Sequence, residues 1–249
     1  MYYYIMGPPR GKIASRQEKT KDILGDLGIA GETVSPSAAR TIEELTHLGI
    51  IKGYSTIVAV GDEALVNKVI TVIATEKTAK DVVLGIIPEN FQSALARKIG
   101  ANDLNSACSI LKQRRLSTTN LVLLDPNKYF ITEAIIRTSR NQEIYFSIGD
   151  LKGKVSANLI TIKPGLEIFI HDQTLEGSKP SQFFRWLFGK KETDVYSTYL
   201  HPKKIRLEAE KSLNIKIAEE LVGKTPAVFS NRSRALKFIV GRGKIKSKD

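Results

Sequence analysis

Two turns of this 249-residue chain contain residues whose types and spacing could do chemistry. The first turn follows a short β-branched run, Thr56 to Val60, and consists of Gly61, Asp62 and Glu63. Apolar residues then recur at helical spacing, which predicts a strand, a sharp turn and a helix N-terminus. Such a turn receives phosphates in open α/β sheets, because backbone N–H groups and the helix dipole face the anion. The alternative is an ordinary strand-to-helix turn with glycine at its corner.

The second turn follows another run typical of a buried strand, Val82 to Pro88. A helical pattern comes after it and stops at Gly100, a residue type that commonly ends helices. Parallel strands bring their carboxyl ends to one edge of a sheet. We therefore expect the turns after Val60 and Pro88 to face one common crevice, where a nucleotide could lie.

These two stretches resemble the catalytic domain of diacylglycerol kinases and related lipid kinases. In that family a Val-Ala-Val strand precedes Gly-Gly-Asp-Gly-Thr, an aliphatic residue, Asn, Glu and Val. A later strand reads Leu-Gly-Ile-Ile-Pro and precedes Leu-Gly-Thr, a small residue and Asn-Asp-Phe-Ala-Arg. The matching positions of this chain are Val58-Ala-Val-Gly61, Asn67, Val69, Leu84-Gly-Ile-Ile-Pro88, Ala96 and Arg97.

The chain departs from the family pattern in the loops that hold phosphate. Asp62, Glu63, Ala64 and Leu65 stand where the family has Gly, Asp, Gly and Thr. In the second loop, the family's Leu, Gly, Thr, Asn and Asp are replaced by Glu89, Asn90, Phe91, Ser93 and Ala94.

The resemblance implies ATP-dependent phosphoryl transfer to the hydroxyl of a diacylglycerol-like lipid, with ATP and Mg²⁺ as cofactors. Glu63 takes the family's Asp position and is the candidate magnesium ligand. Glu220 takes the Glu position of an Asp-Gly-Glu turn and is the candidate general base. The implied nucleotide-binding residues are Gly61, Asp62, Glu63, Ala64, Leu65, Asn67, Pro88, Asn90 and Phe91.

Two other functions stay open. Asp62 beside Glu63 repels a phosphate, at a cost on the order of 1–4 kcal/mol for each pair of charges about 4 Å apart. This favours a catalytically silent relative that binds a nucleotide, a lipid or a protein partner. The formal net charge of +12 also allows a basic nucleic-acid binder. That function is the weakest, because outside residues 183–191 the basic residues show no aromatic interleaving along the chain.

The elements that must position these turns indicate two domains. Strand-like runs alternate with helical patterns over residues 1–118, which predicts a three-layer α/β domain with a parallel sheet. Residues 119–240 consist of short strand-like runs between polar turns, such as Glu143 to Ile148 and Val155 to Ile162. They predict an antiparallel β-sandwich. The lipid kinases also have a β-sandwich, and their last strand returns toward the first domain; residues 241–249 form a basic tail.

One aromatic and basic segment of the second domain is a candidate for contact with a membrane interface. It contains Phe183, Phe184, Arg185, Trp186 and Phe188. The alternative is a short helix whose aromatic side chains cap the sandwich core.

The remaining composition predicts a cytoplasmic protein, and a peripheral position at a membrane surface stays open as an alternative. The single cysteine, Cys108, lies in a helical pattern and is expected to be a buried structural thiol in a reducing compartment. No apolar run approaches the ~20 residues that span a bilayer. The first residues lack the basic and apolar regions of a signal peptide. The oligomeric state is left open.

Overall fold

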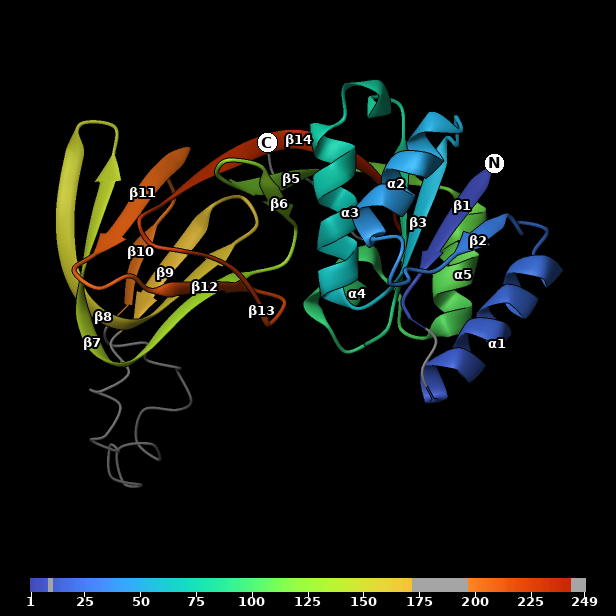
Figure 1. The fold of residues 1–249 in the computed structure, drawn as a ribbon, viewed down its shortest axis with the longest axis horizontal. Helices are drawn as coiled ribbons and strands as arrows, with labels where there is room; N and C mark the ends of the chain where they lie inside the picture. Colours follow the sequence, from blue (N-terminus) through green and yellow to red (C-terminus); the bar gives the residue numbers. More distant parts are fainter. Residues whose placement is uncertain (9–10, 172–196, 243–249) are drawn as a thin grey trace. The chain divides into compact units, whose positions relative to one another are not determined.

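The computed structural model describes residues 1–8, 11–171 and 197–242 (Figure 1). It divides into two compact units. The first contains Met1–Thr132 and the chain from Arg232 onward, and the second contains Glu133–Asn231. The membrane-contact candidates Phe183, Phe184, Arg185, Trp186 and Phe188 lie outside the described residues, as does the basic tail after Arg242.

The first unit contains the expected parallel sheet. Its strands are β1 (Tyr2–Met6), β2 (Glu32–Val34), β3 (Thr56–Gly61) and β4 (Val83–Pro88). They lie in the order β2-β1-β3-β4, and all three pairings are parallel. The end of β14 (Ala227–Ile239) adds a further parallel strand beside β4, with Lys237 opposite Val83. The β-branched runs are buried on both faces, as the helices on either side require.

Helices cover both faces of this sheet. They are α1 (Lys12–Asp26), α2 (Ile42–Ile51), α3 (Glu63–Thr75), the 3₁₀ turn η1 (Lys77–Ala79), α4 (Ala94–Ile99) and α5 (Leu104–Gln113). Tyr3 packs its ring against Gly49 of α2, whereas the hydroxyl of Tyr2 donates to Leu111 O of α5 at 3.2 Å. Because consecutive strand residues point to opposite faces, α2 and α5 lie on opposite sides of β1, in three layers (Figure 1).

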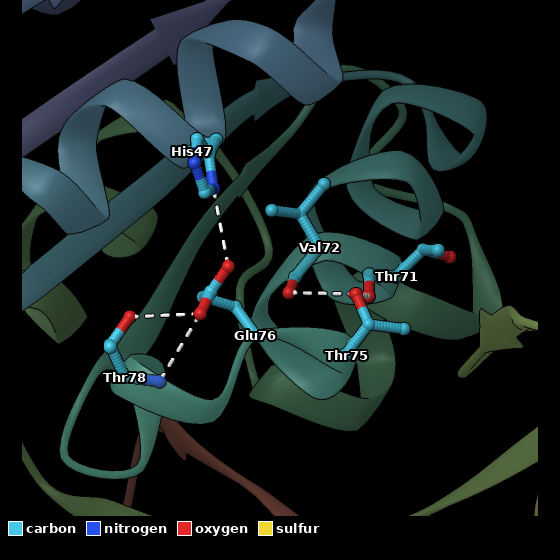
Figure 2. A network of polar contacts seen from close by, with 6 residues as sticks. All are labelled: His47, Thr71, Val72, Thr75, Glu76 and Thr78. Atoms are coloured by element: carbon cyan, nitrogen blue, oxygen red, sulfur yellow. Dashed lines mark hydrogen bonds and ion pairs between the residues drawn. The ribbon is translucent and has the colours of Figure 1, made fainter.

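Side-chain caps determine where several helices begin and end. Thr41 and Glu44 form the capping box of α2, as their spacing indicates. Glu76, which follows α3, caps the 3₁₀ turn η1: its carboxylate accepts hydrogen bonds from the backbone N and the hydroxyl of Thr78, at 3.3 and 3.0 Å (Figure 2). These bonds lower the pKa of Glu76. His47 of α2 lies 3.3 Å from the same carboxylate, so the pair joins α2 to the residue that links α3 and η1.

Cys108 is fully buried in the core of the first unit. Burial raises the pKa of its thiol to about 11, so the thiolate is scarce at neutral pH. This agrees with a structural role. None of the helices in the described part of the chain is long and apolar enough to cross a membrane.

Two further strands of the first unit, β5 (Leu116–Leu124) and β6 (Lys128–Phe130), form an antiparallel hairpin. The second unit is antiparallel throughout its described pairings. Its strands are β7 (Ala134–Ile148), β8 (Leu151–Lys163), β9 (Glu167–His171), β10 (Ser197–Leu200), β11 (Lys204–Ala209), β12 (Asn214–Ile217) and β13 (Glu220–Lys224), with the start of β14.

Besides pairing with β8, the long strand β7 pairs with two other strands. Near its start, Ile135 of β7 lies opposite Lys216 of β12; near its end, Phe146 lies opposite Leu207 of β11. The register shifts between Arg137 and Gln142, and such irregularities bend a strand. The result is the expected β-sandwich architecture, built by a hairpin that is longer than the runs Glu143 to Ile148 and Val155 to Ile162 predicted.

Candidate functional site

The two predicted turns lie side by side at the carboxyl edge of the parallel sheet. Gly61 and Pro88 are register partners at the ends of β3 and β4, and Glu89 N donates to Gly61 O at 2.7 Å. The turn after β1 adjoins them, because Gly7 N donates to Val60 O at 3.0 Å. The strand order reverses between β1 and β3. Ligands of open α/β sheets bind at this kind of position.

Asp62 caps helix α3 with its own carboxylate. Its backbone is extended, and Oδ1 accepts a hydrogen bond from Leu65 N at 2.8 Å. The first N–H groups of a helix have no intrahelical partner, and they are the groups that would bind a phosphate. At α3 the Asp62 side chain supplies an anionic oxygen to these donors. Glu63 follows as the first helical residue and is half-buried.

Leu65 occupies the position of the family's Thr and belongs to the core. Its side chain is 3% exposed. It packs over the turn so closely that a Cβ on Gly61 would lie 3.1 Å from Leu65 Cδ1. Ala64, beside it, is half-buried. This part of the turn therefore presents hydrocarbon where a hydroxyl is expected.

Asn67 uses its side chain inside the first unit. Its Nδ2 donates to Thr132 Oγ1 at 2.9 Å, and its Oδ1 accepts from Ile131 N at 3.2 Å. The side chain is 7% exposed. Asn67 thus joins α3 to the segment that follows β6.

The second turn is also held by contacts within the protein. Asn90 Oδ1 accepts from Gln92 N at 2.8 Å, and the Ser93 hydroxyl caps α4 by accepting from Ala96 N at 3.0 Å. Phe91 is half-buried and packs against the core of the first unit. Arg97 donates to Gln92 O at 2.6 Å.

Arg16 of α1 is the residue at this edge that sequence reasoning missed. Its guanidinium donates to Pro88 O at 2.9 Å and to Glu89 O at 2.5 Å. It also lies 4.7 Å from the centroid of the Phe91 ring, within the range of a cation–π contact. Arg16 and Pro88 are 72 positions apart, so no local pattern could have indicated the contact.

The residues brought together here fit a magnesium triphosphate poorly. The Asp62 carboxylate already lies on the helix N-terminus, and a phosphate about 4 Å from it would cost on the order of 1–4 kcal/mol. The polar groups of Asn67, Asn90 and Arg16 bind protein atoms. Within the described ranges, no three His, Cys, Asp or Glu side chains gather as metal ligands would.

Glu220 lies in the second unit, as the first residue of β13. The two preceding residues, Ala218 and Glu219, have φ values of 50° and 64° and link the paired residues Ile217 and Glu220. Positive φ at both central residues is the mark of a type I′ hairpin turn. The structure thus has a tight turn where the resemblance places the family's Asp-Gly-Glu, and Glu220 is exposed just after it.

Comparison with known proteins identifies the fold. No protein-family model and no curated protein matches the sequence. A solved structure assigned as a diacylglycerol kinase from Bacillus anthracis str. Sterne superimposes with a TM-score of 0.78, at 12% identity over 97% of both chains. The chain has the diacylglycerol kinase fold. Two further structures named as diacylglycerol kinases from that organism give TM-scores of 0.77 and 0.73, at 12% and 13% identity over 98% of each chain.

The diacylglycerol kinase fold accounts for both units of the chain. The matches extend over nearly the whole length, so the α/β unit and the antiparallel unit are both included. The predicted fold class, an α/β domain followed by an antiparallel β-sandwich, is confirmed. At these identities the likeness concerns the fold, and the chemistry must be argued from the residues of this chain.

Proposed function

We propose that this chain is a lipid-kinase-like protein that keeps the diacylglycerol kinase fold but does not transfer phosphate. It acts by binding a lipid or a protein partner. The observation that carries this proposal is the hydrogen bond from Leu65 N to the Asp62 carboxylate at 2.8 Å. That carboxylate competes with a phosphate for the N-terminus of α3 and repels it as well. Leu65 adds a buried hydrocarbon in place of a hydroxyl.

The test compares the natural chain with a variant in which the loop is opened. Purified protein is incubated with γ-labelled ATP, Mg²⁺ and vesicles that contain diacylglycerol, and the unfolding temperature is measured with and without ATP. We expect no labelled lipid and no ATP-dependent rise in unfolding temperature for the natural chain. The triple variant Asp62→Gly, Ala64→Gly and Leu65→Thr should gain an ATP-dependent rise. Asp103→Gly, which removes a cap from α5 instead, is the matched control.

Labelled lipid formed by the natural chain would reject this proposal. It would support the second candidate, ATP-dependent phosphorylation of a diacylglycerol-like lipid. One observation favours that candidate: Glu220 follows a tight turn with positive φ at Ala218 and Glu219, at the position expected for the general base. In that case Glu220→Ala should abolish transfer, whereas the neighbouring Glu219→Gln should retain it. Transfer that persists in Glu220→Ala would reject the base assignment.

A further inference from the structure

Four aromatic rings form a continuous row on one face of the second unit. The row runs from His171 to Phe169 on β9, then to Tyr199 on β10 and to His201 just beyond it. Successive ring centroids are 6.3, 5.2 and 6.4 Å apart. The His171 and Phe169 rings are nearly parallel, with an interplanar angle of 9°.

The register of the sheet explains why these rings share a face. Tyr199 lies opposite Phe169, and Phe169 lies opposite Thr161 of β8. Directly opposed residues of antiparallel strands point to the same side. Ile168 and Ile170, which alternate with the rings along β9, are buried on the other side. The row therefore lies on the face of these strands that points away from the buried isoleucines.

The row is partly exposed, and one of its rings is held in place by a hydrogen bond. Tyr199 is 52% exposed, His201 is exposed, and Phe169 and His171 are half-buried. His201 Nε2 lies 3.0 Å from Gly165 O, and because a carbonyl can only accept, the nitrogen is the donor. The row thus offers flat apolar surface with one ring already oriented.

Cationic side chains border the rings. Lys163 Nζ lies over the Phe169 ring, 4.6 Å from its centroid. Arg137 of β7 is exposed and lies opposite Leu159, which in turn lies opposite His171. An acidic residue, Glu167, lies opposite Lys163 in the register. Aromatic faces beside basic groups form the arrangement that binds unpaired bases and their phosphates.

We propose that this row binds single-stranded nucleic acid, with bases stacked on Tyr199 and Phe169 and phosphates near Lys163 and Arg137. A duplex fits less well, because its bases already stack on one another. An anionic membrane is also less suited, because the rings lie along sheet strands and do not form a protruding apolar tip. The proposal concerns the second unit and does not depend on the turn at Asp62, so either proposal can fail alone.

The experiment measures the fluorescence anisotropy of a labelled oligouridylate of about 16 nucleotides, titrated with the full chain at low salt. Tyr199→Ala and Phe169→Ala should each raise the Kd by a factor of roughly 5 to 150. Tyr199→Phe keeps the ring and should bind like the natural chain. Tyr145→Ala, which removes an exposed tyrosine of β7 from outside the row, is the matched control. Lys163→Gln should reduce the slope of log K against log salt by about 0.7.

Several results would overturn the proposal. The first is an absence of oligouridylate binding at low salt. The second is an equal loss of affinity in Tyr199→Ala and Tyr145→Ala. The third is a duplex of the same length that competes as well as the single strand. A membrane surface would replace nucleic acid as the partner if Tyr199→Ala weakened binding to phosphatidylserine vesicles and left oligonucleotide binding unchanged. Circular dichroism of each variant verifies the fold. If Tyr199→Ala is unfolded, the result for Phe169→Ala decides.

Discussion

Asn67 donates a hydrogen bond from its side-chain amide to the hydroxyl of Thr132, 2.9 Å away, and so ties α3 to the end of the segment Met1–Thr132. One helical turn later, the Thr71 hydroxyl accepts from Tyr129 N and donates to Tyr129 O, both at 3.1 Å. A residue that the family resemblance connects with a nucleotide thus has partners in the protein itself.

Replacing Asn67 with Leu should lower the free energy of unfolding by about 2–3 kcal/mol, because Ile131 N and the Thr132 hydroxyl would lose a buried partner. Urea unfolding followed by circular dichroism measures the change. Asn102→Leu, an exposed asparagine of the same unit, is the control and should change stability by less than about 0.5 kcal/mol. A similar small change in Asn67→Leu would contradict the bridging role.

Asp62→Ala should destabilise the first unit by about 1 kcal/mol, because α3 loses its N-terminal cap. Asp62→Asn keeps an oxygen acceptor for Leu65 N and should retain most of the stability. Thermal unfolding of the two variants beside the natural chain is the measurement. Equal stability in all three proteins would show that the cap contributes nothing.

Gly49→Ala should be destabilising by about 1–3 kcal/mol, since overpacking moves side chains from their preferred positions. A Cβ on Gly49 would lie 2.6 Å from the Tyr3 ring. Gly25→Ala is the matched substitution in α1, where a Cβ meets no atom within 4 Å. It should be stabilising by about 0.4–1 kcal/mol. Urea unfolding measures the change in the free energy of unfolding for each variant. Changes of opposite sign would support the packing of Tyr3 against Gly49, and equal changes would contradict it.

Residues that a type I′ turn favours should stabilise the turn at Ala218 and Glu219. Both have positive φ without being glycine, a backbone conformation that costs roughly 1–2 kcal/mol per residue. Ala218→Asn combined with Glu219→Gly should raise the unfolding temperature, and the exposed Lys216–Glu219 ion pair that is lost contributes little. Glu210→Gly, at an exposed position without positive φ, should give no gain.

Lys98 should make stability depend on pH. Burial lowers the pKa of its ammonium to about 8, below its ordinary value of 10.5. The unfolded chain therefore binds more protons than the folded chain between these values, and the contribution of Lys98 to stability rises with pH there. We expect Lys98→Met to be stabilising at pH 7, with an advantage that shrinks as pH rises from about 8. Unfolding of both proteins over this range measures the difference. If Lys98→Met were more stable than the natural chain by the same amount at every pH, the lowered pKa of Lys98 would be refuted.

Local patterns were sufficient to predict the framework of the first unit. The β-branched runs at Thr56 to Val60 and Val82 to Pro88 form buried parallel strands. Thr41 and Glu44 form the predicted capping box, and Gly100 ends α4 with a φ of 82°. These signals are readable because the interactions behind them join residues only a few positions apart. The assignment of Glu63 to magnesium and of Glu220 to proton transfer stays a prediction.

Other features depend on partners that sequence order does not reveal. The β7–β8 hairpin continues through polar residues beyond the predicted runs, because cross-strand pairing holds them in place. No basic and aromatic interleaving is visible in the chain order around Phe169 and Tyr199, which the register of β9 and β10 places opposite each other.

By itself the sequence determined the two-domain fold class and the two turns that end β3 and β4, because alternating patterns and short-range caps depend on neighbouring residues. Only the tertiary structure decided what the turn residues do. Arg16 reaches Pro88, Asn67 reaches Thr132 and the Asp62 carboxylate stays on α3. The first two contacts join residues distant in sequence, and a polar side chain takes whichever partner the packed chain brings within hydrogen-bonding distance.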